Sequence, residues 1–213
     1  MDLSNIKLIS GNSHKDLAHG ISRKLNLNLT NCIATKFSDG ELRVEIKENI
    51  RNSHIFIIQT GYSHENESYN TNDYLMELLI MVDACKRSAV KSINVIMPYY
   101  MYSRQDKKDE SRAPITAKLV ADLISNSGVN RIVFMDLHSS QIQGFFNIPV
   151  DNIYSAIIFK DYFYNNIFNK YSGEEKKKYF IVISPDAGAA KRTVKFAKIM
   201  GLDMALMHKE RDE

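Results

Sequence analysis

Short apolar runs alternate along the chain with amphipathic stretches. Helices are predicted at 74–87 and 115–124, and near 154–170 and 188–200. Ser13 is expected to cap an earlier helix, with Asp16 as its capping-box partner. The order of strands and helices predicts an α/β fold with a mostly parallel sheet covered by helices on both faces. The runs that predict strands are 6–10, 42–46, 54–60, 92–97, 131–135, 180–184 and 203–207.

The same pattern predicts one whole domain and part of another. A first unit spans 1–154, whereas the unit that begins near 155 shows only two clear strands before residue 213, too few for a complete sheet domain. Polar stretches at 62–73 and 171–178 are expected at the surface. The helix at 74–87 is apolar on nearly every side, which indicates that it is buried all round. The sheet would bury one side, and a second subunit is a candidate for another.

Composition and charge exclude several classes of protein. A net charge of +3 with both signs mixed does not favour nucleic-acid binding, and no signature of that class is present. No apolar run reaches the ~18 residues of a membrane span, and the first residues lack the pattern of a signal peptide. Cys32 and Cys85 have no metal-binding spacing, so both are expected as reduced thiols in the cytoplasm.

Polar residues gather where the predicted strands end. In an open parallel sheet, ligands bind beyond the carboxyl ends of the strands. Four such ends carry acids, bases and amides, which favours one assembled site for a charged small molecule. These residues are Arg104 and Gln105 after 92–97, Asp136 and His138 after 131–135, Asp186 after 180–184, and Lys209 and Arg211 after 203–207.

Each pair also has a simpler explanation. On an extended segment Asp136 and His138 would point to the same side and reach one cation or phosphate, but they are equally an acid that caps a turn and a packed histidine. Arg104 with Gln105 suits a polyphosphate and a base or ribose, or is a solvated mixed-charge loop. Asp186 suits a ribose hydroxyl or a magnesium-bound water, or complements a helix dipole.

The remaining polar segments are weaker signals when taken alone. Lys209 and Arg211 suit a transferring phosphoryl group or form a charged tail. Residues 38–41, Ser-Asp-Gly-Glu, predict a hairpin turn. There is no GxxxxGK[ST], so the chain is not a P-loop enzyme, and no GxGxxG follows a strand.

Taken together, these segments are far more specific. FSDGELRVEI (37–46), SRQDKKDESRAPITAKLVADL (103–123), MDLHSSQIQGFFNIPVDNIY (135–154) and SPDAGAAKR (184–192) with HKER (208–211) closely resemble ribose-phosphate pyrophosphokinase, also called phosphoribosyl-pyrophosphate synthetase. That resemblance implies transfer of the pyrophosphoryl group of ATP to ribose 5-phosphate, giving phosphoribosyl pyrophosphate and AMP. It also implies Mg²⁺, two phosphoribosyltransferase-like domains, and homo-oligomers, dimeric or hexameric.

The resemblance assigns a role to each matching residue. It implies that ATP is bound partly across a subunit boundary and that a cationic pair stabilises the transferring group. It also implies two magnesium positions, with His138 at one, Asp186 at the second and Asp136 beside them. The implied residues are Phe37, Asp39, Glu41, Arg104 and Gln105 for ATP, Asp136, His138 and Asp186 for the metal, and Lys209 and Arg211 for catalysis.

Two departures from the family pattern qualify these roles. The ribose 5-phosphate loop, an acidic pair followed by Asp-Thr-Gly-Gly-Thr, has no counterpart in the 213 residues, and Asn147 stands where many members have Asp, which puts a metal role near Asp151 in doubt. The chain is therefore either a truncated form of an active synthetase or a non-catalytic subunit that assembles with a full-length relative. An ordinary phosphoribosyltransferase is disfavoured because its signature is the missing loop. We expect self-association and no substantial synthesis by this chain alone.

Overall fold

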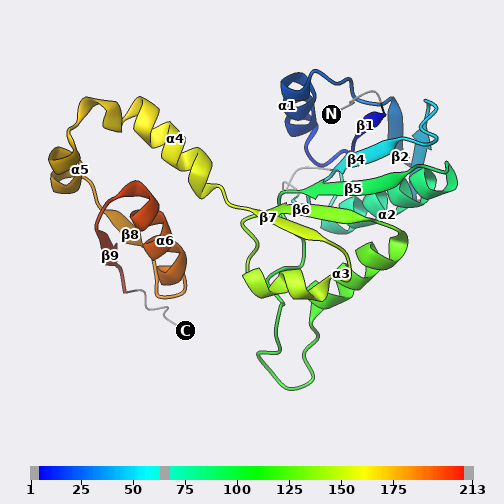
Figure 1. Ribbon diagram of the computed structural model, residues 1–213. Helices are drawn as coiled ribbons and strands as arrows, with labels where there is room; N and C mark the ends of the chain where they lie inside the picture. Colours follow the sequence, from blue (N-terminus) through cyan, green and yellow to red (C-terminus); the bar gives the residue numbers. More distant parts are fainter. Residues whose placement is uncertain (1–4, 63–67, 209–213) are drawn as a thin grey trace. The chain divides into compact units, whose positions relative to one another are not determined.

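The computed structural model describes residues 5–62 and 68–208. The chain folds as two compact units, Met1–Ile153 and Tyr154–Glu213, the change falling one residue before the expected boundary (Figure 1). The first unit is built on a five-stranded, wholly parallel sheet with the strand order β1-β4-β5-β6-β7, which confirms the expected α/β class. Its strands are β1 (Ile6–Ser10), β4 (His54–Ile58), β5 (Ser92–Met97), β6 (Arg131–Met135) and β7 (Val150–Ile153).

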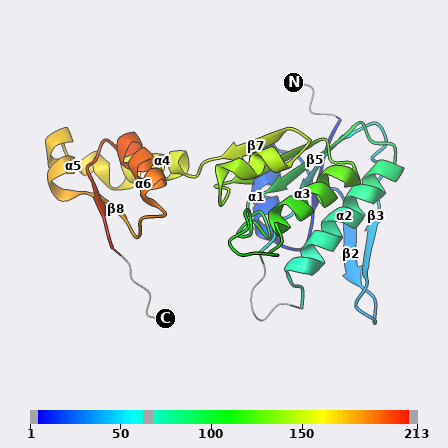
Figure 2. The same ribbon diagram turned by 90° about the horizontal axis from the view of Figure 1, so that it is seen from below.

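One face of this sheet forms the main core. Ile57, Val95 and Ile132 stand in register on three neighbouring strands, and all are fully buried. They pack with helices α2 (Thr71–Arg87) and α3 (Thr116–Ser127), which lie in front of the sheet when it is seen from below (Figure 2). Helix α1 (Lys15–Leu25) lies beside β1, and its buried Ala18 is outside this core cluster. Helices therefore cover both faces, as expected.

The helix starts differ from two expectations. His14, not Ser13, caps α1, because the His14 ring nitrogen Nδ1 accepts the Leu17 amide, and the prediction for Ser13 was wrong because its hydroxyl is taken by a distant residue, Gln59. Helix α2 begins at Thr71, inside the expected surface segment, because the side chains of Asn70 and Asp73 form a capping box.

A β-hairpin packs against α2. It consists of β2 (Cys32–Lys36) and β3 (Leu42–Ile46), joined by the predicted turn, in which Gly40 has a φ of +95°. Strand β2 was not predicted. Because the hairpin, the sheet and α3 all contact α2 within one chain, the apolar sides of this helix no longer argue for a second subunit.

The second unit has an aromatic core. Phe168 is 2% exposed, and the rings of Phe163, Tyr164 and Phe180 lie within 5.7 Å of its ring, centre to centre. The expected polar connector at 171–178 is largely helical, because Ser172 and Glu175 form a capping box. The elements of this unit are α4 (Ala156–Asn166), η2 (Phe168–Lys170), α5 (Gly173–Tyr179), β8 (Val182–Ser184), α6 (Ala190–Met200) and β9 (Met204–Leu206), with β8 and β9 paired in parallel.

The helices of both units are too short or too polar to cross a membrane, as far as the described residues extend.

Candidate functional site

The carboxyl ends of β5, β6 and β7 meet at one edge of the sheet. The Met135 amide donates to the Pro98 carbonyl at 3.1 Å, and the Asp136 amide donates to the Ile153 carbonyl at 2.9 Å. The segments that leave β5 and β6 therefore start side by side. These two segments carry four of the candidate residues, so the topology brings the predicted polar clusters to the same edge.

Asp136 does not lie on an extended segment. Its φ is +49°, in the left-handed region, and the chain then turns into the 3₁₀ helix η1 (Ser140–Phe145). A left-handed residue reverses the local direction of the chain, so the alternation that would place Asp136 and His138 on the same side does not apply, and that premise was wrong. Asp136 is half-buried and His138 is exposed. Left-handed backbone at a non-glycine residue stores strain of about 1–3 kcal/mol, which is common at ligand sites.

In the segment after β5, the exposed Arg104 and Gln105 directly follow buried residues. Met101 and Ser103 are buried, whereas Arg104 and Gln105 are exposed. The carbonyl of Gln105 accepts the Ala117 amide at 3.1 Å, and its side-chain Oε1 accepts the Thr116 hydroxyl at 2.6 Å. Gln105 is thereby tied to the first turn of α3.

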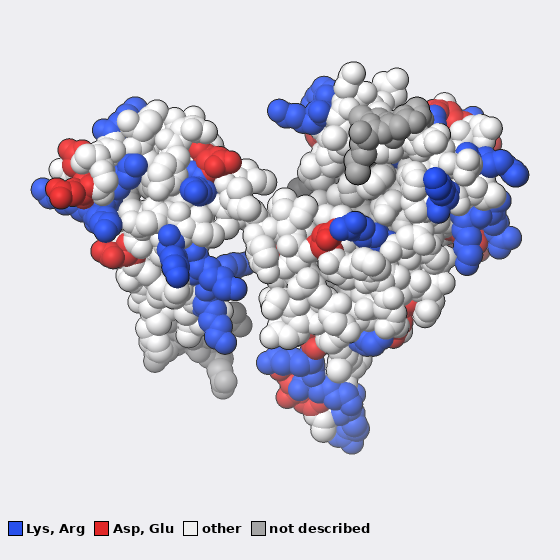
Figure 3. Space-filling view, in the orientation of Figure 1, with Lys and Arg blue, Asp and Glu red and all other residues white. Residues whose placement is uncertain are grey.

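The charged loop between Gln105 and α3 pairs with itself in part. Lys107 Nζ lies 3.0 Å from Asp109 Oδ1, and the hydrogen bond and charge of Asp109 raise the pKa of Lys107. Positive and negative side chains are mixed on the loop that projects below α3 (Figure 3). Among the ion pairs of residues 5–62 and 68–208, none includes Arg104. The guanidinium of Arg104 is therefore available to an anion, whereas Lys107 and Asp109 fit the simpler explanation of a solvated loop.

The hairpin turn carries the other expected ATP contacts. Phe37 is 51% exposed, Asp39 Oδ1 accepts the Glu41 amide at 3.1 Å, and the Phe37 amide donates to the Glu41 carbonyl at 2.8 Å. The hairpin lies apart from the loop before α3 in both views (Figures 1 and 2). Within one chain, the structure therefore does not bring these three residues to Arg104 and Gln105.

Asp186 belongs to the second unit, just beyond β8. Its Oδ1 accepts the Ala189 amide at 2.9 Å, and the buried Ser184 donates its hydroxyl to the Asp186 carbonyl at 2.8 Å. Asp186 therefore closes the turn at 187–189 that precedes α6 (Ala190–Met200) and does not lie in the first turn of that helix, and its other carboxylate oxygen is not part of that bond. Lys209 and Arg211 lie outside the described residues.

The acids of the first unit meet the requirements of Mg²⁺ only in part. Nowhere in the described part of the chain do three His, Cys, Asp or Glu side chains gather as a metal site. Mg²⁺ usually keeps several waters and takes only one or two carboxylates with substrate phosphates, so Asp136 at the sheet edge fits it, whereas the His138 ring is a poor ligand for this ion. Asp151 is engaged elsewhere: Arg131 lies 2.6 Å away and lowers its pKa.

Sequence reasoning missed a group of buried polar residues at the same edge of the sheet. Gln59 and Glu77 are both fully buried and hydrogen-bonded to each other at 2.9 Å. A signal was present, since Gln59 directly follows the apolar run HIFII and Glu77 interrupts the apolar helix segment YLMELLIM. A polar residue inside an apolar run is informative because burial demands a partner.

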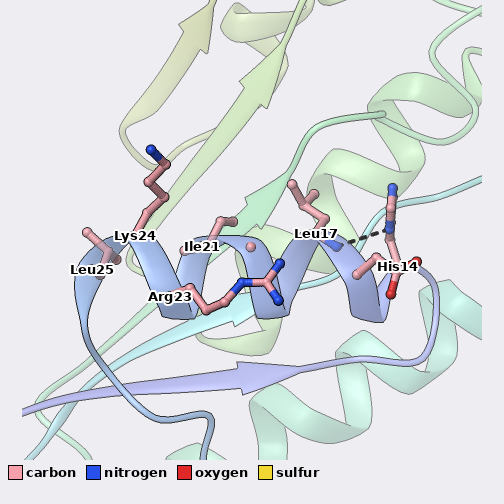
Figure 4. Close-up of a pocket in the computed structure, with 8 residues that line it drawn as sticks. His14, Leu17, Ile21, Arg23, Lys24 and Leu25 are labelled. Carbon is pink, nitrogen blue, oxygen red and sulfur yellow. Dashed lines mark hydrogen bonds between the residues drawn. The ribbon is translucent and has the colours of Figure 1, made fainter.

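A groove along α1 lies outside the candidate site. Leu17, Ile21 and Leu25 follow one another on the helix, with Lys24 beside them and His14 at its start (Figure 4). None of the residues expected from the sequence to bind ATP or metal lines this groove. The shape of the surface therefore does not mark the site, which is identified by the polar strand ends.

Comparison with known proteins agrees with the earlier resemblance. Residues 6–128 match the family described as the N-terminal domain of ribose phosphate pyrophosphokinase. The chain is 44% identical over all 213 residues to Ribose-phosphate pyrophosphokinase 2 of Schizosaccharomyces pombe, of which it spans 63%. It is 48% identical over 206 residues, 97% of this chain, to Ribose-phosphate pyrophosphokinase A of Dictyostelium discoideum, of which it spans 61%.

A solved structure gives the same result. Phosphoribosylpyrophosphate synthetase from Mycobacterium smegmatis matches with a TM-score of 0.84 and 37% identity, over 98% of this chain and 66% of that one. The family match covers more than half of the chain and includes β1 to α3. The chain therefore belongs to the ribose-phosphate pyrophosphokinase family.

Proposed function

We propose that the chain supplies the ATP-binding part of a ribose-phosphate diphosphokinase. The reaction transfers the pyrophosphoryl group of ATP to ribose 5-phosphate and yields phosphoribosyl pyrophosphate and AMP for nucleotide biosynthesis. The observation that carries this proposal is the match of residues 6–128 to the N-terminal domain of this enzyme family. A cytoplasmic location is part of this proposal, and the free thiols of Cys32 and Cys85 support it.

The nucleotide is bound by two surfaces in this proposal. Within the described part of the chain the Arg104 guanidinium takes part in no ion pair, and it can bind phosphate oxygens through two parallel hydrogen bonds. Its neighbour Gln105 is hydrogen-bonded to Thr116 at the start of α3. Phe37, Asp39 and Glu41 lie on an exposed turn away from that loop. We therefore assign them to the ATP site of a neighbouring copy, which makes a homo-oligomer part of the proposal.

The reaction also needs positive charge around the phosphates. Asp136 and His138 on the first unit are proposed to lie at one magnesium position, and Asp186 on the second unit is proposed for a separate, second one. Mg²⁺ would supply positive charge that neutralises the phosphates in the transition state. Asp136 contributes a carboxylate from the sheet edge, and His138 is exposed enough to contact a phosphate oxygen instead of the metal. Lys209 and Arg211 are proposed to stabilise the charge that develops on the transferring group.

A non-catalytic role is the second candidate. The chain spans 61–63% of the two relatives described above, and its 213 residues contain no ribose 5-phosphate loop of the family type. The second unit also exposes large apolar side chains, among them Ile157 at 63%, Ile158 at 60% and Leu206 at 53%. In this role the chain would bind Mg-ATP, and a longer relative would supply the sugar-phosphate loop.

One experiment tests both candidates. The purified chain is incubated with ATP, Mg²⁺ and ribose 5-phosphate, alone and with a full-length relative, and AMP is measured by chromatography. We expect Mg-ATP binding without AMP formation by the chain alone. Formation of AMP that depends on ribose 5-phosphate would show that the loop is dispensable. Absence of both ATP binding and an effect on the relative would overturn the proposed function.

A matched pair of histidine variants tests the sheet edge. His138→Ala is expected to weaken Mg-dependent ATP binding by about tenfold, the loss of roughly one charge-assisted hydrogen bond. His19→Ala, exposed on α1, serves as the control and should bind like the unmodified chain. Equal calorimetric affinities for both variants would remove His138 from the site.

A further inference from the structure

Glu77 is an acid buried in the centre of the first unit. It lies on α2, is 0% exposed, and accepts hydrogen bonds from the Asn12 amide at 2.7 Å, from Asn12 Nδ2 at 2.8 Å and from Gln59 Nε2 at 2.9 Å. All three donors are neutral. Removing a carboxylate from water costs several kcal/mol unless strong partners replace the water. A well-packed apolar side chain would stabilise α2 at least as well, so the acid points to a role in what it holds.

Gln59 links Glu77 by hydrogen bonds to the residues that follow β1. Its Nε2 donates to Glu77 and to the Tyr74 carbonyl at 3.1 Å, while its Oε1 accepts the Ser13 hydroxyl at 2.5 Å and the Ser13 amide at 3.2 Å. The amide is thus fixed in one orientation. Gly11 leaves the room it needs, since a Cβ there would lie 2.1 Å from Gln59 Oε1.

Ser13 and Thr60 carry the chain of hydrogen bonds to β5. Having donated to Gln59, the Ser13 hydroxyl accepts the Thr60 amide at 2.8 Å. Thr60 Oγ1 in turn accepts the Tyr99 amide at 3.2 Å and donates to the Tyr99 carbonyl at 3.4 Å. Four side chains therefore connect α2, the ends of β4 and β1, and the first residues beyond β5.

The segment that starts at Tyr99 leads directly to Arg104. Between them, Met101 is fully buried against Gly61 and the Tyr100 hydroxyl donates to the Ala117 carbonyl at 2.6 Å. The far end is tied at Gln105, as described above. Residues 99–105, which include the exposed Arg104, are thus anchored at both ends and along their buried side.

We propose that Glu77 is a positioning residue for the nucleotide. Through Gln59, Ser13 and Thr60 it holds residues 99–105 in the conformation that presents Arg104 to a polyphosphate. This inference rests on the proposed role of Arg104 in ATP binding. Its physical basis is preorganisation: a cation already held in the binding geometry loses little conformational entropy when the anion arrives.

Two variants break the network at opposite ends. Glu77→Gln keeps the shape but turns one of the two acceptor oxygens into an NH₂ group. At the Oε1 position this group faces the Asn12 amide and Gln59 Nε2, and at the Oε2 position it faces Asn12 Nδ2, so at least one donor loses its acceptor. Thr60→Val keeps the shape and removes only the hydroxyl that accepts the Tyr99 amide. Asp83→Asn, on the same helix in an exposed pair with Arg87, is the matched control.

The readouts are amide hydrogen exchange, Mg-ATP affinity by calorimetry, and thermal unfolding. We expect faster exchange concentrated in residues 99–105 and a tenfold or larger loss of affinity, on the order of that produced by small misplacements of binding groups, in both Glu77→Gln and Thr60→Val. Asp83→Asn should change neither. If Glu77→Gln does not fold, Thr60→Val carries the test, because it leaves the buried acid and its three donors in place.

The outcomes separate this inference from the proposed function. Unchanged exchange at 99–105 in Thr60→Val, or loosening spread evenly over the first unit, would overturn the positioning role. A fall in affinity without faster exchange at 99–105 would overturn it as well. If the unmodified chain binds no Mg-ATP while both variants still loosen 99–105 selectively, the network stands and the assignment of ATP to Arg104 fails.

Discussion

Gly61 offers a sharp test of how closely the segment after β5 is packed. A Cβ added at this position would lie 2.5 Å from Met101 Cβ, 3.0 Å from its amide nitrogen and 3.1 Å from its Cα. Met101 is fully buried, and the contacting atoms belong to the backbone or lie next to it, so no side-chain rotation relieves the overlap. Overpacking of this kind costs about 1–3 kcal/mol, and we expect Gly61→Ala to destabilise the first unit by that amount.

The assay is thermal unfolding followed by far-ultraviolet circular dichroism. For a chain of this size, a loss of 1–3 kcal/mol corresponds to a fall in Tm of roughly 3–9 °C. Gly20→Ala is the matched control, because Gly20 is helical and has nothing within 4 Å of an added Cβ. Alanine is the better helix former by about 0.5–1 kcal/mol, so the control should raise Tm.

The two substitutions are chemically identical and differ only in their surroundings. A Tm for Gly61→Ala equal to or above that of the unmodified chain would show that Met101 moves freely, and would refute the view that residues 99–105 are rigidly packed. Equal losses in both variants would attribute the effect to the backbone alone.

Three further predictions concern charge, thiols and the core. Burial raises the pKa of Asp73, but hydrogen bonds from Lys36 and a backbone amide outweigh burial, so the pKa is lowered in the folded chain. The carboxylate therefore stabilises the fold above its unfolded pKa, and this stabilisation is lost as pH falls through the folded pKa. Asp73→Asn should cost about 1–2 kcal/mol at neutral pH and nothing in acid, as measured by urea unfolding. Burial raises the pKa of Cys32 to about 11 and that of Cys85 to about 12; alkylation at neutral pH should be slow in the folded chain and rapid at both thiols in denaturant. Phe134→Ala should cost about 3–5 kcal/mol by calorimetry, because the ring is 1% exposed; a loss below 1 kcal/mol would contradict this packing.

Strands and helices with a strong local pattern were predictable. β1, β4, β5 and β6 are apolar runs, and their pattern depends only on neighbours in the sequence. β7 was missed because Asp151 and Asn152 interrupt its apolar character at the edge of the sheet. α5 was missed because it is short and rich in Glu and Lys. β2 was missed because it exists through pairing with β3 and packing near α2, which are contacts made at a distance along the chain.

The candidate site was also predictable only in part. Its residues could be named from the sequence, because Arg104, Gln105, Asp136 and His138 follow predicted strands and match a family pattern. Their geometry could not, since the left-handed φ of Asp136 depends on where β6 and β7 pair.

The α/β class, the order of the central strands along the chain and the residues at their ends all follow from local sequence patterns. The folded chain was needed to show that the Ser13 hydroxyl bonds to Gln59 instead of capping α1, and that Glu77 accepts the Asn12 amide just beyond β1. Those hydrogen bonds join residues 46 and 65 positions apart. A local pattern reports burial, but the partner of a buried polar group is set by how the elements pack.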